Sequence, residues 1–314
     1  MTDRNTFGID TTTNEVLDGV DLHGTTAVVT GASGGLGAET ARAFASKGAE
    51  VVLAVRDMAK GVEVAHDIRE STGNDAVEVD ELHLDSLFSV RAFAERFTDR
   101  HGSLHILVNN AGVMGCPHET TSDGFERQFG TNHVGHFLLT MLLLPALEHG
   151  ARVVAVSSRS HQLSPVVFDD IHFENRPYDK FSSYGQSKTA NILFAVEFEQ
   201  RYADRGLHAY ALHPGVIRTE VSRHLEPDDY KQVRKRATGG RFHIKTVEAG
   251  ASTAVYAATA PELGDRGGLY LENCQVSGVD DEDNAPTGVR SYAIDPTNAA
   301  RLWRATEQMV ADHR

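Results

Sequence analysis

Tyr184 and Lys188 are the residues of this sequence best suited to chemistry, and they lie four positions apart in an amphipathic stretch that reaches roughly to Arg205. On a helix, side chains at this spacing share a face. A phenol with a pKa of about 10 is a poor acid at neutral pH, and a neighbouring ammonium lowers that pKa because it favours the phenolate. The pair could therefore act as a general acid or base. The alternative is a surface pair that contributes only a few tenths of a kcal/mol to a helix.

The elements that would position this pair alternate between short β-branched runs and longer helical patterns. We expect strands at residues 27–30, 50–55, 77–82, 105–108, 152–157, 208–212 and 268–271. Helices lie between them, including one that Asp85 or Ser86 caps. Strands separated by helical crossovers form a parallel sheet. The pattern therefore predicts an α/β fold, a single doubly wound Rossmann-type domain with a mostly parallel seven-stranded sheet, whose ligands lie at the carboxyl ends of the strands.

Net charge and cysteine content limit the kinds of partner that we expect and the cellular compartment. The 314 residues carry a formal net charge of −14 and include only two cysteines, Cys116 and Cys274. The acidic balance argues against nucleic acid or an anionic membrane surface as a partner. No CxxC and no histidine cluster has metal-ligand spacing, so we expect no metal, and the cysteines fit small apolar residues in a reducing compartment.

Two stretches of the sequence bear on targeting and membrane insertion. Residues 1–23 are polar and lack the apolar core of a secretory signal. The longest apolar run, 137–147, is too short to span a bilayer and fits a buried helix. We expect a cytoplasmic protein without membrane insertion, with a polar extension over 1–23, a dinucleotide-binding and catalytic domain over 24–279, and a C-terminal loop and helix over 280–314.

A glycine-rich turn follows the first expected strand and opens an alanine-rich helix. Its glycines at 31, 35 and 37 would let the backbone turn tightly and approach a pyrophosphate, which the amides and dipole of the helix N-terminus stabilise. A lone glycine-rich turn is a weak signal, because a purely structural turn looks similar. The strand before it and the helix after it favour nucleotide binding.

The spacing of this turn, G-x-x-x-G-x-G, resembles the fingerprint of the short-chain dehydrogenase/reductase family. Further matches follow in the order typical of that family: Asn109-Asn110-Ala111-Gly112, Asn132, Ser157-Ser158, Tyr184-x-x-x-Lys188 and Pro214-Gly215. The resemblance covers the chain from about Asp21 to the end of the seventh expected strand. Residues 128–137 and 184–191 are similar to the branch that holds retinol dehydrogenases, the WW-domain oxidoreductase and light-dependent protochlorophyllide reductase.

This resemblance implies catalytic roles. Tyr184 would exchange a proton with the substrate oxygen while C4 of a nicotinamide exchanges a hydride. Ser158 would hydrogen-bond that oxygen, and Lys188 would bind the nicotinamide ribose and lower the tyrosine pKa. Asn132 would help hold a water that connects Lys188 to solvent. Ser157 fits the role of Ser158 less well, because in this family the second serine of the pair faces the substrate.

The resemblance also implies a set of cofactor contacts. They are Gly31, Ser33, Gly35, Leu36, Gly37, Arg56, Leu84, Asn110, Ala111, Gly112, Tyr184, Lys188, Pro214, Gly215, Ile217 and Thr219. Where relatives usually place an aspartate that contacts adenine, this chain has His83, so backbone groups of the neighbouring Leu84 would provide the contact instead.

The residues after the second strand indicate which cofactor binds. An NAD enzyme of this fold needs a carboxylate about 20 residues beyond the glycine turn. That position falls on Val55, and Arg56 follows it. Arginine can bind a 2′-phosphate with two charge-assisted hydrogen bonds. We therefore expect NADP, with NAD as the alternative if Asp57 turned inward or if Arg56 merely stacked on adenine.

Apolar residues indicate the substrate class. Those expected at the site entrance are Leu163, Val166, Val167 and Phe168, together with Val221, Leu225 and Tyr230 of a variable substrate loop at about 220–245. Apolar walls favour apolar ligands. His161, three residues after Ser158, is either a solvated loop histidine or a group that reaches the substrate.

The function expected from the sequence is hydride transfer between NADP and a carbonyl or secondary alcohol of an apolar small molecule. The oligomeric state is left open, with a homo-oligomer among the alternatives. One alternative activity is reduction of a carbon–carbon double bond, as in the protochlorophyllide branch. A different class is a dinucleotide-binding sensor or scaffold without turnover, which the intact catalytic residues argue against, because a pure binder needs no proton donor.

Overall fold

The computed structural model describes residues 7–217, 225, 228–229, 243–283 and 285–313. Its strands are β1 (Thr26–Thr30), β2 (Glu50–Val55), β3 (Val77–Glu81), β4 (Leu104–Asn109), β5 (Leu147–Val156), β6 (His208–His213), β7 (Leu269–Glu272) and β8 (Gln275–Val276). They form one sheet in the order β3-β2-β1-β4-β5-β6-β7-β8. All neighbours are parallel except β7 and β8.

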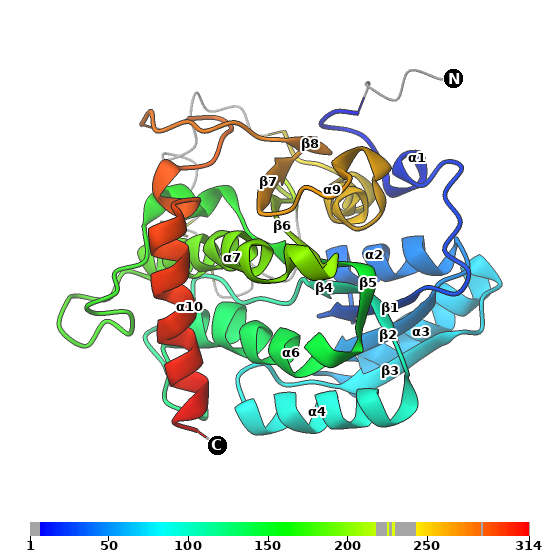
Figure 1. The fold of residues 1–314 in the computed structure, drawn as a ribbon, viewed down its shortest axis with the longest axis horizontal. Helices are drawn as coiled ribbons and strands as arrows, with labels where there is room; N and C mark the ends of the chain where they lie inside the picture. Colours follow the sequence, from blue (N-terminus) through cyan, green and yellow to red (C-terminus); the bar gives the residue numbers. More distant parts are fainter. Residues whose placement is uncertain (1–6, 218–224, 226–227, 230–242, 284, 314) are drawn as a thin grey trace.

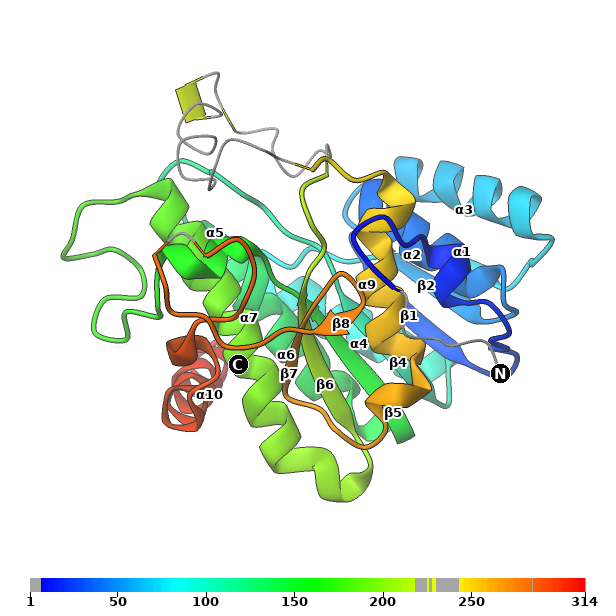
Figure 2. The same ribbon diagram turned by 90° about the horizontal axis from the view of Figure 1, so that it is seen from above.

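Helices cover both faces of this sheet (Figure 1). The α-helices are α1 (Thr13–Val16), α2 (Gly35–Ala45), α3 (Met58–Thr72), α4 (Leu87–Arg100), α5 (Arg127–Phe129), α6 (Gly135–Leu143), α7 (Lys180–Tyr202), α9 (Val247–Thr259) and α10 (Pro296–Ala311). The π-helix η1 (Gly130–Val134) joins α5 to α6, and the short 3₁₀ helices are η2 (Leu144–Ala146), η3 (Arg159–Leu163), η4 (Ala203–Arg205), η7 (Pro261–Leu263) and η8 (Ser291–Ala293). One apolar core lies between the sheet and α4, α6, α7 and α10, and a second lies between the sheet and α2, α3 and α9 (Figure 2).

This arrangement confirms the predicted fold class, with all seven expected parallel strands present. The prediction of seven strands was one short, because β8 pairs antiparallel with β7 through a two-residue turn at Asn273 and Cys274. Both turn residues have positive φ, 52° and 58°, as a type I′ hairpin requires. Glycine usually supplies that conformation, so the sequence carried a weak turn signal here. The buried Cys274 thiol donates to Ser252 Oγ at 3.3 Å, which anchors the turn.

Helix α7 is the longest element and carries Tyr184 and Lys188. It begins before the predicted stretch, at Lys180, because the Asp179 carboxylate accepts a hydrogen bond from the Ser182 amide at 2.7 Å. Its side chains are buried almost continuously from Phe181 to Phe198. A helix that is buried on most sides, with both apolar and polar side chains, needs packing and hydrogen-bond partners on several sides.

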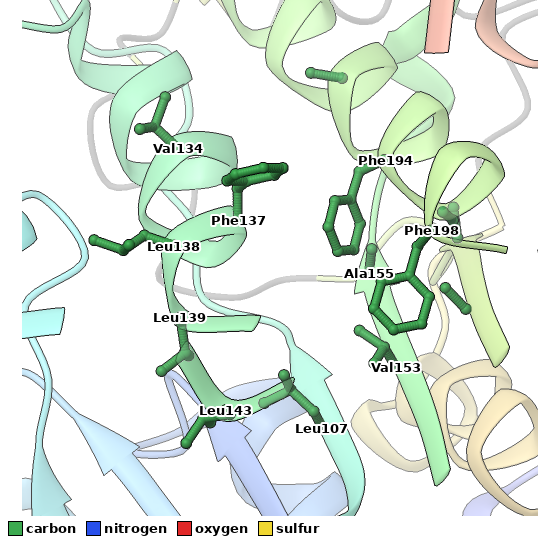
Figure 3. Packing of buried hydrophobic residues seen from close by; sticks show 14 of the residues in the cluster. Leu107, Val134, Phe137, Leu138, Leu139, Leu143, Val153, Ala155, Phe194 and Phe198 are labelled. Atoms are coloured by element: carbon green, nitrogen blue, oxygen red, sulfur yellow. The ribbon is translucent and has the colours of Figure 1, made fainter. Parts of the chain in front are cut away.

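The core holds α7 in place through aromatic contacts. Figure 3 shows Phe194 of α7 facing Phe137 of α6, with ring centroids 6.1 Å apart. Trp303 of α10 stacks on Phe194 at 5.7 Å and is fully buried. The C-terminal helix α10 therefore packs against α7, which carries the predicted catalytic pair.

Two further segments depart from the sequence-based expectation in detail. The apolar run at 137–147 is a helix only to Leu143, because Pro145 lies in η2 and Leu147 already pairs with Leu104 as the first residue of β5. In the N-terminal stretch, Val16 and Leu17 are buried in the core beneath α9. Among the described residues, no helix is both long enough and apolar enough to cross a membrane.

Candidate active site

The carboxyl end of β5 and the first half of α7 bring three predicted catalytic residues together. Tyr184 and Lys188 lie one turn apart on α7, and the Lys188 Nζ is 5.5 Å from the centre of the Tyr184 ring. Both side chains are buried. The Ser158 hydroxyl, just after β5, hydrogen-bonds the tyrosine side chain. The Lys188 Nζ donates to the Val156 carbonyl oxygen at 2.9 Å, which anchors the ammonium at the strand end.

Burial dominates the electrostatics of this group. It raises the pKa of Tyr184 to about 12, against a smaller opposite effect of the Ser158 hydrogen bond. It lowers the pKa of Lys188 to about 7, because the ammonium loses its hydration. The structure thus places a phenol that stays protonated at neutral pH beside a lysine whose charge titrates near neutrality. From the sequence alone we expected a lowered tyrosine pKa; this expectation is wrong, because burial of the phenol raises its pKa.

The two serines after β5 point in different directions. Ser157 Oγ donates to the Lys188 carbonyl oxygen at 2.8 Å, so its hydroxyl is used by the backbone of α7. Ser158 Oγ accepts from the Ser160 amide at 3.1 Å and remains beside Tyr184. The structure therefore assigns the position next to the phenol to the second serine of the pair.

Gly185 makes this approach of η3 to α7 sterically possible. A Cβ at this position would lie 2.6 Å from the Ser160 carbonyl oxygen and 3.1 Å from the Leu163 Cβ. Real side chains do not tolerate the first distance, so glycine is required. The sequence showed this glycine beside the tyrosine, but its role depends on a contact that only the fold reveals.

Asn132 lies in η1, a π-helical turn of a kind often found at functional sites. Its Oδ1 accepts from the Val113 amide at 2.8 Å, and its Nδ2 donates to the Val113 carbonyl and to Ser187 Oγ, each at 3.0 Å. The side chain therefore ties the loop after β4 to α7. Lys188 is close by, because a Cβ on Gly112 would lie 3.2 Å from Asn132 Oδ1 and 3.6 Å from Lys188 Nζ.

The glycine turn after β1 interlocks with the loop after β4. Gly31 has a φ of +67°, and a Cβ there would lie 2.9 Å from the Cα of Ala111. A Cβ on Gly37 would lie 2.6 Å from Asn110 Nδ2. That amide nitrogen donates to the Thr30 carbonyl at 2.7 Å, which holds the two loops together.

The first turn of α2 follows the glycine turn directly. Gly35, with a φ of +55°, and Leu36 belong to its first turn, where helix geometry leaves the amides without intrahelical acceptors. Ser33 is half-buried and lies just before this turn. Unpaired amides at a helix N-terminus suit a phosphate.

Arg56 and Asp57 occupy different roles at the end of β2. The Arg56 side chain is exposed, and none of the described residues pairs with its guanidinium. The Asp57 carboxylate accepts from the Lys60 amide at 3.2 Å and is the N-cap of α3. The arginine is therefore available to a ligand, whereas the aspartate is engaged by its helix.

The adenine side of the predicted site is formed by the loop after β3. Leu84 is buried, and its carbonyl oxygen lies so close to Gly135 that a Cβ there would be 2.3 Å away. His83 Nε2 lies 3.1 Å from a carboxylate oxygen of Glu81. The histidine is thus paired with the last residue of β3, and Leu84 follows it in the loop.

Four of the predicted cofactor contacts follow β6, and the structure describes three of them. Pro214 and Gly215 are half-buried, and Gly215 has a φ of +102°. Ile217 packs with Leu36 against Gly250 of α9, where a Cβ would lie 2.6 Å from Ile217 Cγ1. Thr219 lies outside the described residues.

The residues predicted at the site entrance differ in burial and in the elements that they contact. Val166 is buried in the core. Phe168 is half-buried, and the Arg301 guanidinium of α10 lies 4.4 Å from the centre of its ring. That these two residues line the entrance stays a prediction. Leu163 is 38% exposed, and Leu225 comes so close to Gly115 that a Cβ there would be 2.4 Å from Leu225 Cδ2. Val167 is half-buried, and Val221 and Tyr230 fall outside the described ranges.

His161 has a role that neither sequence-based alternative included. It is fully buried, its Nδ1 donates to the Ser158 carbonyl at 2.8 Å, and its Nε2 accepts from the Arg290 amide at 3.2 Å. Burial lowers the pKa of this imidazole to about 4, so it is neutral at pH 7. Its ring therefore connects the backbone of Ser158 to the C-terminal segment and is neither solvated nor turned toward substrate.

Sequence reasoning also missed His136 and Thr30. The His136 Nδ1 donates to the Asn132 carbonyl at 3.0 Å, and its Nε2 lies 2.9 Å from Thr30 Oγ1. That hydroxyl oxygen accepts from the amides of Asn110 and Ala111, each at 2.9 Å. The pair thus joins the predicted catalytic asparagine to the cofactor loops. A possible signal was the second histidine of the Asn132-to-His136 motif.

Comparisons with known proteins agree with this geometry. The sequence model of the short chain dehydrogenase family matches residues 25–229. Human retinol dehydrogenase 12 is 41% identical over 293 residues, covering 93% of this chain and 88% of its own length. The short-chain dehydrogenase/reductase prx1 of Penicillium roqueforti is 40% identical over 290 residues, covering 90% and 84%.

Solved structures show the same fold. An uncharacterised protein from Mycobacterium paratuberculosis has a TM-score of 0.73 at 35% identity, covering 96% of this chain and 98% of its own. A short chain dehydrogenase from Burkholderia cenocepacia in complex with NADP has a TM-score of 0.64 at 24% identity, covering 84% and 99%. The chain therefore belongs to the short-chain dehydrogenase/reductase family, in its retinol dehydrogenase-like branch, and is an NAD(P)-dependent oxidoreductase.

Proposed function

We propose that this oxidoreductase prefers NADP and transfers a hydride between nicotinamide and a carbonyl or alcohol group of an apolar small molecule. The observation that carries the proposal is the buried Tyr184 phenol, hydrogen-bonded by Ser158 and one helical turn from Lys188. The residues present fit a dinucleotide, because the glycine positions leave no room for a Cβ and the first turn of α2 offers unpaired amides. When bound, the cofactor supplies or accepts the hydride.

The side chains of this site would supply the proton and orient the substrate. A carbonyl oxygen beside both hydroxyls would accept hydrogen bonds from Ser158 and Tyr184, and these bonds strengthen as negative charge develops on that oxygen. The phenol, protonated at rest, then gives its proton to the oxygen as a general acid. Lys188 would bind the nicotinamide ribose, and its ammonium would favour the phenolate that remains. Asn132 would position the loop after β4 and hold the water that links Lys188 to solvent.

Preference for NADP is supported by the end of β2. Arg56 is exposed and available, and Asp57 is engaged as the cap of α3. A guanidinium can form two charge-assisted hydrogen bonds with a 2′-phosphate. A carboxylate turned toward the ribose, which would favour NAD, is disfavoured by the capping bond.

An apolar substrate is supported by the relatives and by the residues around the site. Several relatives, each about 41% identical, are named for retinol, an apolar alcohol. Leu163 and Leu225 add apolar surface near η3 and the loop after β4. A cytoplasmic location belongs to the same proposal and fits the buried thiols of Cys116 and Cys274.

A panel of carbonyl compounds tests the activity directly. NADPH oxidation would be followed at 340 nm with aromatic, terpenoid and retinoid aldehydes or ketones, and with acetoin as the small polar comparison. We expect a higher kcat/KM for the apolar compounds. Equal or better efficiency with acetoin would overturn the substrate class, and cofactor binding without turnover of any member would favour a sensor over an enzyme.

A further inference from the structure

We propose that Glu50, Glu78 and His101 form a binding site for a divalent transition metal of the zinc type, at the end of the sheet opposite the dinucleotide site. Glu50 begins β2, Glu78 lies near the start of β3, and His101 follows the last residue of α4. Figure 1 shows α4 running beside β3. One ring nitrogen and one oxygen from each carboxylate lie within 4.8 Å of one another. Nothing in the proposed oxidoreductase chemistry uses these residues.

His101 is the observation that distinguishes this cluster from an ordinary acidic surface. Its side chain is only 5% exposed. Its Nε2 is buried and has no hydrogen-bond partner among the described residues, although a Glu78 oxygen lies 3.5 Å away. On the other side of the ring, Nδ1 lies 3.2 Å from a Glu50 oxygen. A buried polar nitrogen without a partner is costly, and a metal bond would satisfy it.

The donor set and its spacing suit zinc. Zinc binds nitrogen and oxygen at about 2.0–2.2 Å in tetrahedral sites, which places neighbouring donors about 3.4 Å apart. The His101 Nε2 and the Glu78 oxygen, 3.5 Å apart, already fit this spacing. Glu50 is 41% exposed, so its carboxylate can turn to supply the third bond. An imidazole with two carboxylates favours zinc or a similar ion over calcium and magnesium, which take oxygen ligands.

Neighbouring groups hold the three ligands in place. The His101 ring stacks on Phe97 with centroids 4.7 Å apart, and the Thr26 hydroxyl donates to the second oxygen of Glu50 at 3.3 Å. Arg100 Nη1 lies 3.7 Å from the Glu78 oxygen, but this guanidinium also pairs with Asp80. Such outer contacts orient metal ligands and tune their affinity. The bound ion would join the starts of β2 and β3 to the end of α4.

Zinc titration of the full chain tests the site. Protein treated with a chelator and then dialysed would be titrated with zinc chloride at pH 7.5, by calorimetry and by thermal unfolding. We expect one saturable zinc site and a Tm that rises with zinc concentration. Glu78→Gln should weaken zinc binding by about 10–100-fold and remove the rise in Tm. Glu78 is 44% exposed, so this variant keeps the test usable if His101→Asn fails to fold.

A matched control separates this site from adventitious zinc binding. His66 and Glu70 form an exposed pair on α3, 4.0 Å apart, and His66→Asn should leave both zinc affinity and the zinc-dependent Tm unchanged. Absence of saturable binding by the wild type would overturn the proposal. So would wild-type zinc affinity in Glu78→Gln. If His101→Asn lowered the Tm equally with and without zinc, the three residues would be an ion triad only.

Discussion

At the scale of single residues, the candidate site combines the buried Tyr184 phenol, the buried Lys188 ammonium and the Ser158 hydroxyl. Backbone groups hold two of them: the Val156 carbonyl binds Lys188, and the Ser160 amide binds Ser158. The sequence identified Ser158, Tyr184 and Lys188 because their spacing is carried by local motifs. It did not indicate these roles for His161 or Gly185, because the His161 ring also contacts the distant Arg290 amide and Gly185 lies where η3 packs against α7. Long-range contacts of this kind leave no spacing pattern in the chain.

Arg56 is the residue on which the proposed preference for NADP depends. Arg56→Ala should lower kcat/KM for NADPH relative to NADH by roughly tenfold or more, because about 1.5–3 kcal/mol is typical of hydrogen bonds to charged groups. Steady-state kinetics with both cofactors would measure the ratio. Arg304→Ala, an exposed arginine on α10, is the control. An unchanged NADPH/NADH ratio in Arg56→Ala, or a wild-type preference for NADH, would refute the assignment.

We expect His161 to act as a positioning residue through the Ser158 carbonyl. His161→Gln should lower kcat by roughly 10–100-fold while the KM for NADPH changes little, because small misplacements of reacting groups are costly in rate. His208→Gln removes another buried histidine at the opposite end of the sheet and should leave kcat unchanged. A parallel loss of kcat in both variants would show that the effect is general destabilisation.

At the scale of elements, the alternation of strands and helices could be predicted because most of the parallel strands are short apolar runs, several of them rich in valine, separated by longer helical patterns. Seven strands were predicted for this reason. The hairpin to β8 was missed, because Asn273 and Cys274 supply its positive φ values in place of glycine. The contact between Phe168 and Arg301 of α10 could not be predicted, because periodicity cannot tell which apolar residues a distant helix covers.

The Gly185→Ala variant tests whether the close packing of η3 against α7 is needed for activity. Helix propensity alone favours alanine over glycine by about 1 kcal/mol in a helix interior. A Cβ at Gly185 would instead clash with the Ser160 carbonyl, so Gly185→Ala should reduce kcat by tenfold or more, on the order expected for a misplaced Ser158. Gly102→Ala, where nothing lies within 4 Å of the added Cβ, should be neutral. Wild-type kcat in Gly185→Ala would show that η3 shifts without cost.

At the scale of the whole molecule, buried neutral histidines make the fold sensitive to acid. Burial lowers the pKa of His133 and His213 to about 3, and that of His136 and His161 to about 4, whereas unfolded histidine titrates near 6.5. Between these values the unfolded chain binds more protons than the folded one. These four histidines therefore lower the free energy of unfolding as pH falls below about 6.5.

Chemical denaturation at several pH values measures this effect. We expect the free energy of unfolding to drop by about 4 kcal/mol or more between pH 7 and pH 5, since each histidine contributes up to about 1.4 kcal/mol per pH unit. His133→Gln should reduce the slope by about one proton. A free energy of unfolding that stays constant over this pH range would contradict the buried, neutral state of these side chains.

The most direct test of the catalytic account is the turnover of Tyr184→Phe, with the best apolar substrate of the panel and NADPH. The variant keeps the ring in its buried position and removes only the hydroxyl that Ser158 contacts. We predict a loss in kcat of about 10²–10⁴-fold, typical for a general acid, with a Kd for NADPH within about twofold of the wild type. A variant that retained more than about half of the wild-type kcat would contradict the role of Tyr184 as the proton donor.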